Sequence, residues 1–186
     1  DDGCSPTCTL EPCEPTPAAG CRAAAATKSL LKAKVKTSDT TKNQLQWKWS
    51  KGAATTKGEF GNPLGTETYY LCVYDAGALV STTRIEAGGL CAGTPCWKES
   101  SKGFQFKDKE LTPDGAQQLK LMAGEAGKAQ AQFKGKGVNL ELPSLSGLTG
   151  PIEVRLKQAS NLVCWGATFD APFTKQSAEA FVDKSN

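Results

Sequence analysis

The sequence contains no histidine. Histidine is the commonest general base of enzymes and a common ligand of zinc and copper, so its absence excludes serine–histidine and cysteine–histidine nucleophile pairs and most transition-metal sites. We therefore expect no catalytic residue, no metal site and no cofactor, and we predict that the protein is not an enzyme.

Long apolar runs are also missing. A membrane-spanning helix needs roughly 18 to 20 consecutive apolar residues, and no stretch approaches this length, so we predict no membrane span. The first residues, "DDGCSPTC", have neither the basic nor the apolar region of a signal peptide. We expect the sequence to be the mature form of an exported protein.

Arginine is scarce. Only Arg22, Arg84 and Arg155 are arginines among the 22 basic residues, and the net charge is +3. Proteins that read nucleic acids favour arginine forks and concentrate their positive charge on one face. Here lysines alternate with apolar residues, as in "LKAKVK", which is typical of a solvated strand face. We predict no nucleic-acid partner.

Cysteine, in contrast, is abundant. Eight cysteines, an even number, indicate disulfides and an oxidising compartment, so we expect a secreted protein, extracellular or at the cell surface. Four of them crowd the first 21 residues beside four prolines: Cys4, Cys8, Cys13 and Cys21. A four-thiolate zinc site is the alternative for this segment, although the spacing lacks the paired C-x2-C of a zinc knuckle.

The other four cysteines predict two bridges. In "GGLCAGTPCWKES", Gly93 and Pro95 lie between Cys91 and Cys96, which favours a tight disulfide-closed loop over the C-x-x-C of a redox site. Cys72 and Cys164 lie within strongly apolar runs. A bridge between them would close a long loop. In the chain-entropy model it would stabilise the fold by roughly 4 to 5 kcal/mol, because it lowers the entropy of the unfolded chain. Two buried free thiols are the alternative. The four N-terminal cysteines are then expected to pair among themselves.

The pattern of apolar residues predicts an all-β fold. Residues 1–27 read as an extended arm rich in cysteine and proline, because proline density forbids an ordinary helix or central strand. From residue 28 to 186, period-two alternation separated by Gly, Pro, Asn and Asp turns predicts an antiparallel β-sandwich, jelly-roll or Ig-like. The expected strands, about ten, are 29–36, 44–49, 68–75, 78–85, 103–109, 117–123, 128–134, 138–143, 152–158 and 162–170. The only helix candidate is "KQSAEAFVDK", residues 175–184.

Aromatic and acidic residues supply few site candidates. Trp47, Trp49 and Trp165 share strand faces with other apolar residues and are expected in the core, whereas Trp97, beside the stapled loop, is expected to be partly exposed and to contact a ligand. The acidic residues near turns are expected to cap those turns, with an irregular calcium site as the alternative; they are Asp75, Asp108, Glu110, Asp114 and Asp170.

Several phrases together resemble a known domain. "QWKWSKGAATT", "YLCVYD", "AGGLCAGTPCWK", "GFQFKDKELTPDG" and "VCWGATFDAPFTK" are similar to a secreted β-domain that recurs in proteins of delta-type bacteria from soil and sediment. The resemblance spans roughly residues 28–184, and the domain often follows a cysteine-rich segment. It has no assigned activity, so it implies an extracellular location and carries over no site residue.

Three functions remain open at this point. The first is a structural or adhesive surface protein that self-associates into oligomers or fibres, with its arm or its first strand (28–36) completing a neighbour's sheet; pairing of that strand within its own domain is the favoured alternative. The second is a glycan-binding module that stacks sugars on Trp97 and on tyrosines 69, 70 and 74. The third is a hydrolase with paired carboxylates.

Overall fold

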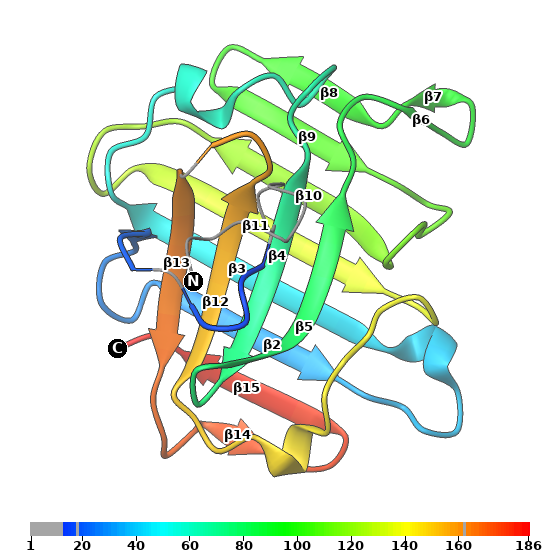
Figure 1. The fold of residues 1–186 in the computed structure, drawn as a ribbon, viewed down its shortest axis with the longest axis vertical. Helices are drawn as coiled ribbons and strands as arrows, with labels where there is room; N and C mark the ends of the chain where they lie inside the picture. Colours follow the sequence, from blue (N-terminus) through cyan, green and yellow to red (C-terminus); the bar gives the residue numbers. More distant parts are fainter. Residues whose placement is uncertain (1–12, 18, 162) are drawn as a thin grey trace.

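The computed structural model describes residues 13–17, 19–161 and 163–186, and its described part contains no α-helix. Two large β-sheets lie one in front of the other, and their strands run in different directions (Figure 1). The chain is therefore all-β, as the alternation predicts, and the sheets do not close into a barrel.

The larger sheet has eight strands, and every neighbouring pair is antiparallel. In spatial order these strands are β14 (Lys175–Gln176), β15 (Ala180–Lys184), β2 (Ser29–Lys34), β3 (Gln44–Gly52), β11 (Ala129–Lys136), β10 (Ala116–Met122), β9 (Gly103–Lys107) and β8 (Trp97–Ser100).

The smaller layer has five strands, and only the pairing of its first two is parallel. In spatial order they are β1 (Arg22–Ala23), β13 (Cys164–Phe169), β12 (Ile152–Gln158), β4 (Tyr69–Asp75) and β5 (Ala78–Ile85). The remaining two strands, β6 (Leu90–Cys91) and β7 (Thr94–Pro95), form a short hairpin beside β8 (Figure 1).

One core lies between the two layers. Every second residue of each long strand is buried, because successive side chains of a strand point to opposite faces. The eight-stranded sheet contributes Trp47, Trp49 and Phe133, and the five-stranded sheet contributes Leu71 and Trp165, to a single cluster of buried side chains. The core position expected for the three tryptophans 47, 49 and 165 is confirmed, since each is at most 1% exposed.

Nine of the ten predicted strand ranges contain a strand, and the tenth, 138–143, is wrong. Strand β11 ends at Lys136, and the next residue, Gly137, has a φ of +95°. This left-handed conformation, which glycine tolerates, turns the chain out of the sheet. Residues 138–143 then follow an irregular path in which Leu140 is buried and Val138 is 61% exposed.

The predicted helix over residues 175–184 is also wrong, because these residues form β14 and β15. Phe181 and Asp183 are buried on one side of β15, which is the period of a strand. The Phe181 ring packs edge-on against Phe173, with the ring centres 4.9 Å apart. Tertiary packing of this kind overrides the weak helical preference of a short segment.

The first long strand, β2, pairs within its own chain. It lies between β15 and β3 and is hydrogen-bonded to both of them. The strand therefore has no free edge to offer to a neighbouring molecule, and strand addition through residues 29–34 is ruled out in this structure.

Candidate functional site

The two layers have very different outer faces. The outer face of the five-stranded sheet is covered by the described part of the arm, which two disulfides attach to the sheet. Cys13 is bonded to Cys72 on β4, and Cys21 is bonded to Cys164 on β13. The predicted Cys72–Cys164 bridge is therefore wrong, and so is the expectation that Cys13 and Cys21 pair within the arm. Cys4 and Cys8 lie outside the described residues.

The disulfide pairing follows from the direction of the side chains. Cys72 is opposite Arg155 across β4 and β12, and Cys164 is opposite Lys157 across β12 and β13. Both cysteines thus point to the outer face, and β12 separates their strands. A disulfide joins Cα atoms usually 4.4–6.8 Å apart, whereas strands on either side of a third lie about 9.6 Å apart.

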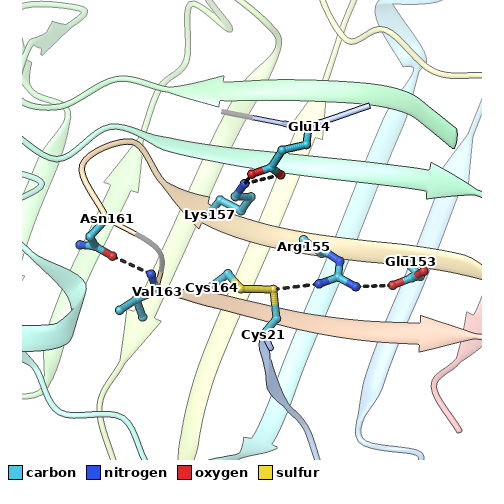
Figure 2. The surroundings of a disulfide bond; sticks show 8 residues. All are labelled: Glu14, Cys21, Glu153, Arg155, Lys157, Asn161, Val163 and Cys164. Atoms are coloured by element: carbon cyan, nitrogen blue, oxygen red, sulfur yellow. Dashed lines mark hydrogen bonds and ion pairs between the residues drawn. A yellow bond between two sulfur atoms is a disulfide. The ribbon is translucent and has the colours of Figure 1, made fainter. Parts of the chain in front are cut away.

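Polar contacts fix the arm further (Figure 2). Glu14 forms an ion pair with Lys157, which is only 7% exposed. Arg155 donates from Nη2 to the Glu153 carboxylate at 2.5 Å, and its Nη1 lies 3.3 Å from the sulfur of Cys21. A hollow of about 280 Å³ beside this disulfide contains Glu153, but the ion pair with Arg155 already occupies that carboxylate. The disulfides and ion pairs on this face therefore have a structural role, which is to attach the arm to the sheet.

The aromatic residues proposed for sugar stacking are mostly buried. Trp97 is 3% exposed, its Nε1 donates to the Glu86 carbonyl at 2.7 Å, and its ring packs against Phe106. The expectation that Trp97 is partly exposed is therefore wrong, because the residue after the stapled loop turns into the core. Tyr69 and Tyr74 are fully buried, and burial raises the pKa of Tyr74 to about 12. Only Tyr70 is half-buried.

The carboxylates near turns accept backbone hydrogen bonds. Asp75 accepts from the amides of Thr149 and Gly150, and Asp108 accepts from those of Glu110 and Thr112. In the same way, the Arg84 amide donates to Asp114 and the Ala92 amide donates to Glu110, whereas Asp170 accepts from the Asn186 side chain. Capping of loops is thus their structural role.

Within the described ranges, no group of three or more acidic or cysteine side chains is placed to hold a metal ion.

The stapled loop lies at one end of the larger sheet. Cys91 is bonded to Cys96, the pair that the spacing predicts. The hairpin borders a hollow of about 280 Å³, whose other wall consists of outward-facing residues of β8 and β9. Three lysines line it: Lys98, Lys107 and Lys109.

These lysines belong to a much larger charged surface, the outer face of the eight-stranded sheet. Buried and outward positions alternate along its longer strands, and the outward positions contain lysine and glutamine in large number but no aspartate or glutamate. The exposed Glu99 on β8 lies opposite the buried Phe104, on the other side of the sheet, and pairs with Lys57. We call this surface the lysine–glutamine face. It comprises Lys32, Lys34, Lys48, Lys98, Lys107, Lys120, Lys134, Lys136, Lys175 and Lys184, with Gln44, Gln46, Gln105, Gln118, Gln130 and Gln132 between them.

The strand register arranges these residues in rows that run across the strands. One row reads Lys175, Val182, Lys32, Gln46, Lys134, Gln118 and Lys107, from β14 to β9. The next row reads Lys184, Leu30, Lys48, Gln132, Lys120, Gln105 and Lys98, from β15 to β8. In each row lysine occupies every second strand, and the second row is displaced by one strand from the first.

This arrangement keeps like charges apart. Each lysine in the two rows has a neutral residue directly opposite it on each neighbouring strand of the row, so no two lysines form a directly opposed pair, which would be destabilising. Within the described part of the chain, none of the ten lysines forms an ion pair. Eight of them are exposed, and Lys120 and Lys136 are half-buried. The face therefore presents an uncompensated positive charge to the solvent.

Both edges of the five-stranded sheet form hydrogen bonds with other parts of the chain. On β5, the Arg84 amide donates to Asp114, the Ser81 hydroxyl donates to the Glu141 carbonyl and the Leu79 amide donates to the Pro15 carbonyl. On β1, the Ala23 carbonyl accepts from the Ala53 amide, next to β3. Such protection blunts an edge against pairing with another chain.

The sequence predicts the alternation of lysine with apolar residues in single strands, but it does not predict that these strands form one lysine–glutamine face. The alternation within β2 or β11 indicates only that one side of the strand is wet. Which lysines become neighbours depends on the strand order, which links β2 to β15 and β3 to β11 across long stretches of sequence. The sequence does contain one indication of the face. The segments "QLQWK", "AQAQFK" and "QQLK" each place glutamine and lysine at alternate positions, which is the solvent-facing side of a strand.

Comparison with protein-family models, curated proteins and solved structures found no match to this chain. No helix in the described residues has the length and apolar character needed to cross a bilayer.

Proposed function

We propose that this protein is an extracellular adhesive protein that binds acidic polysaccharides through the lysine–glutamine face. The observation that carries the proposal is the set of ten unpaired lysines on one face whose strand positions include no carboxylate. A surface of one charge sign raises the local concentration of ligands of the opposite sign. A polyanion would replace the many counterions that such a surface holds.

The chemistry of the face favours a polysaccharide among polyanions. Proteins that bind single-stranded nucleic acids combine positive charge with exposed aromatic rings for base stacking, and no aromatic residue lies at an outward position of these eight strands. Arginine, the residue preferred for phosphate recognition, is likewise absent from these positions. Glutamine side chains, in contrast, supply both donors and acceptors, which suit the hydroxyl groups of sugars.

A lipid surface fits less well. Proteins that insert into an interface present large apolar side chains beside basic ones. The apolar side chains between the lysines of the two rows, Leu30 and Val182, are half-buried, and the large exposed apolar residues, such as Leu90, lie outside these strands.

The scaffold supports the same proposal. We infer that the two layers form a β-sandwich, a support on which the face keeps its strand register. Three disulfides support an oxidising, extracellular location. The described part of the arm is attached to the opposite layer, so it leaves the lysine–glutamine face open to a large ligand.

The test is a variant in which the four lysines of the first row become glutamine: K32Q/K107Q/K134Q/K175Q. We expect its affinity for hyaluronan at low salt to fall roughly tenfold or more, because each exposed ion pair contributes about 0.2–1 kcal/mol. The measurement is isothermal titration calorimetry or retention on a hyaluronan column.

The matched control has the same loss of charge outside the face: K28Q/K42Q/K102Q/K128Q. These four lysines are exposed and lie outside the eight strands. Equal loss of binding in both variants would mean that net charge alone attracts the ligand, and the face would lose its assigned role. Thermal unfolding of both variants checks that the fold is retained.

A further inference from the structure

The lysine spacing indicates which acidic polysaccharide the face would hold; this inference rests on the proposed function and specifies its ligand. Neighbouring strands lie about 4.8 Å apart, so lysines on alternate strands of a row are about 9.6 Å apart. Two strand spacings are also close to the length of an extended disaccharide unit. We propose that the face binds a linear polysaccharide that crosses the strands and carries one acidic group per disaccharide.

The residues between the lysines fit the neutral sugar of such a repeat. From β3 to β8, the intervening residues of both rows are glutamines: Gln46 and Gln118 in the first row, Gln132 and Gln105 in the second. An amide can donate to one sugar hydroxyl and accept from another. A lysine ammonium is a compact charge on a flexible stem, so it can reach a carboxylate or sulfate while the polymer follows the twist of the sheet. Acidic and neutral sugars would thus alternate in register with lysine and glutamine.

The number of lysines in a row sets the length of the binding unit. Each row has four lysines, on every second strand from β14 to β9 or from β15 to β8. Four acidic groups at one per disaccharide correspond to an octasaccharide. At their β8–β9 end, the rows reach the hollow lined by Lys98, Lys107 and Lys109 beside the Cys91–Cys96 hairpin. We expect the bound polysaccharide to end at this hollow.

The first experiment compares polymers of different charge spacing. Hyaluronan carries a carboxylate on every second sugar, polygalacturonate carries one on every sugar, and dextran is neutral. We expect hyaluronan to bind more tightly per carboxylate than polygalacturonate, and dextran not to bind. We also expect the affinity of hyaluronan oligosaccharides to rise from tetrasaccharide to octasaccharide and to change less than twofold beyond that length, which calorimetry measures directly.

The second experiment breaks the spacing without changing the charge. The double variant K134Q/Q118K moves one lysine of the first row by one strand, from β11 to β10, where the two positions are directly paired. We expect its affinity for the hyaluronan octasaccharide to fall about two- to fivefold, and its affinity for polygalacturonate to change less than twofold. Circular dichroism and thermal unfolding establish that the variant is folded.

The outcomes separate this inference from the proposed function. If affinity follows charge density alone and K134Q/Q118K binds hyaluronan as the unchanged protein does, the spacing inference is wrong while polysaccharide binding stands. If neither polymer binds at low salt, the proposed function itself fails. Preferential binding of double-stranded DNA or of phosphatidylglycerol vesicles would overturn both, since the partner would then belong to another class.

Discussion

At the scale of single residues, the packing of Trp49 depends on Gly52. A Cβ atom added to Gly52 would lie 1.8 Å from Cη2 of Trp49, whose ring is 1% exposed. The end of β3 thus depends on the absence of a side chain at this position. Strand β3 bulges here, because Ser50 and Lys51 lie between Trp49 and Gly52 whereas only Gln130 lies between their partners Ala131 and Ala129 on β11.

We predict that Gly52→Ala destabilises the protein by about 1–3 kcal/mol, because the buried ring of Trp49 has to move in a well-packed core. The measurement is urea unfolding followed by tryptophan fluorescence. Gly58→Ala is the matched control: no atom lies within 4 Å of the added Cβ, so we expect a change of less than about 1 kcal/mol. Equal effects of the two substitutions would contradict the packing argument.

The burial of a side chain could be predicted from the sequence where it depends on the alternation within one strand. It could not be predicted where it depends on contacts with other parts of the fold. Trp47 and Trp49 alternate with polar residues in one strand, so their burial could be predicted. The direction of Trp97 depends on how the chain leaves the Cys91–Cys96 loop, and its ring is held by Tyr69 and Phe106 from other strands. No local pattern records these contacts.

At the scale of elements, the disulfides differ in what they constrain. The Cys91–Cys96 bond closes a loop with a separation of 5 residues, whereas Cys21–Cys164 joins the arm to β13 across a separation of 143. In the chain-entropy model these separations correspond to about 2 and about 5 kcal/mol. The long-range bond is therefore the main covalent determinant of the position of the arm.

We predict that C21S/C164S lowers the free energy of unfolding by about 5 kcal/mol and C91S/C96S by about 2 kcal/mol. The two double variants are closely matched, since each removes one half-buried sulfur and one sulfur that is 6% exposed. Urea unfolding at equilibrium gives both values. Losses of equal size would show that the local environment of the sulfur atoms, and not the closed loop, determines their contribution.

The strands themselves were the most predictable elements. Alternation located β5 and β12 to the residue and the start of β3, because half-buried strands impose a period of two on the sequence. The cysteine pairing was not predictable in the same way, because it depends on the path of the arm over β4 and β13. The short strands β8 and β14 carry too few residues to show a period.

At the scale of the whole molecule, the fold places the attachment of the arm and the lysine–glutamine face on different layers. The arm and two disulfides occupy the outer face of one layer, and ten unpaired lysines occupy the outer face of the other. The strand order creates this second face, since β2, β3, β10 and β11 come from distant parts of the chain. That is why the face could not be predicted from the sequence, although its longer strands β2, β3, β9, β10 and β11 were predicted there.

A concentration of like charge has a cost in stability, which salt should reduce. Diagonal lysine neighbours of the two rows lie about 7–8 Å apart, and the Debye length falls from about 30 Å at 0.01 M salt to about 8 Å at 0.15 M. We predict that the melting temperature rises over this range. In K32Q/K107Q/K134Q/K175Q the rise should be smaller than in K28Q/K42Q/K102Q/K128Q. Calorimetry without ligand measures it, and an identical salt response in both variants would contradict the repulsion argument.

The Cys21–Cys164 bond also decides how the molecule responds to a pulling force. Tension applied between the arm and the C-terminus crosses directly from Cys21 to Cys164 and leaves along β13, so the chain between them, a separation of 143 residues, stays slack. An oxidised molecule can lengthen only outside this loop. Reduction would release roughly 500 Å of extended chain.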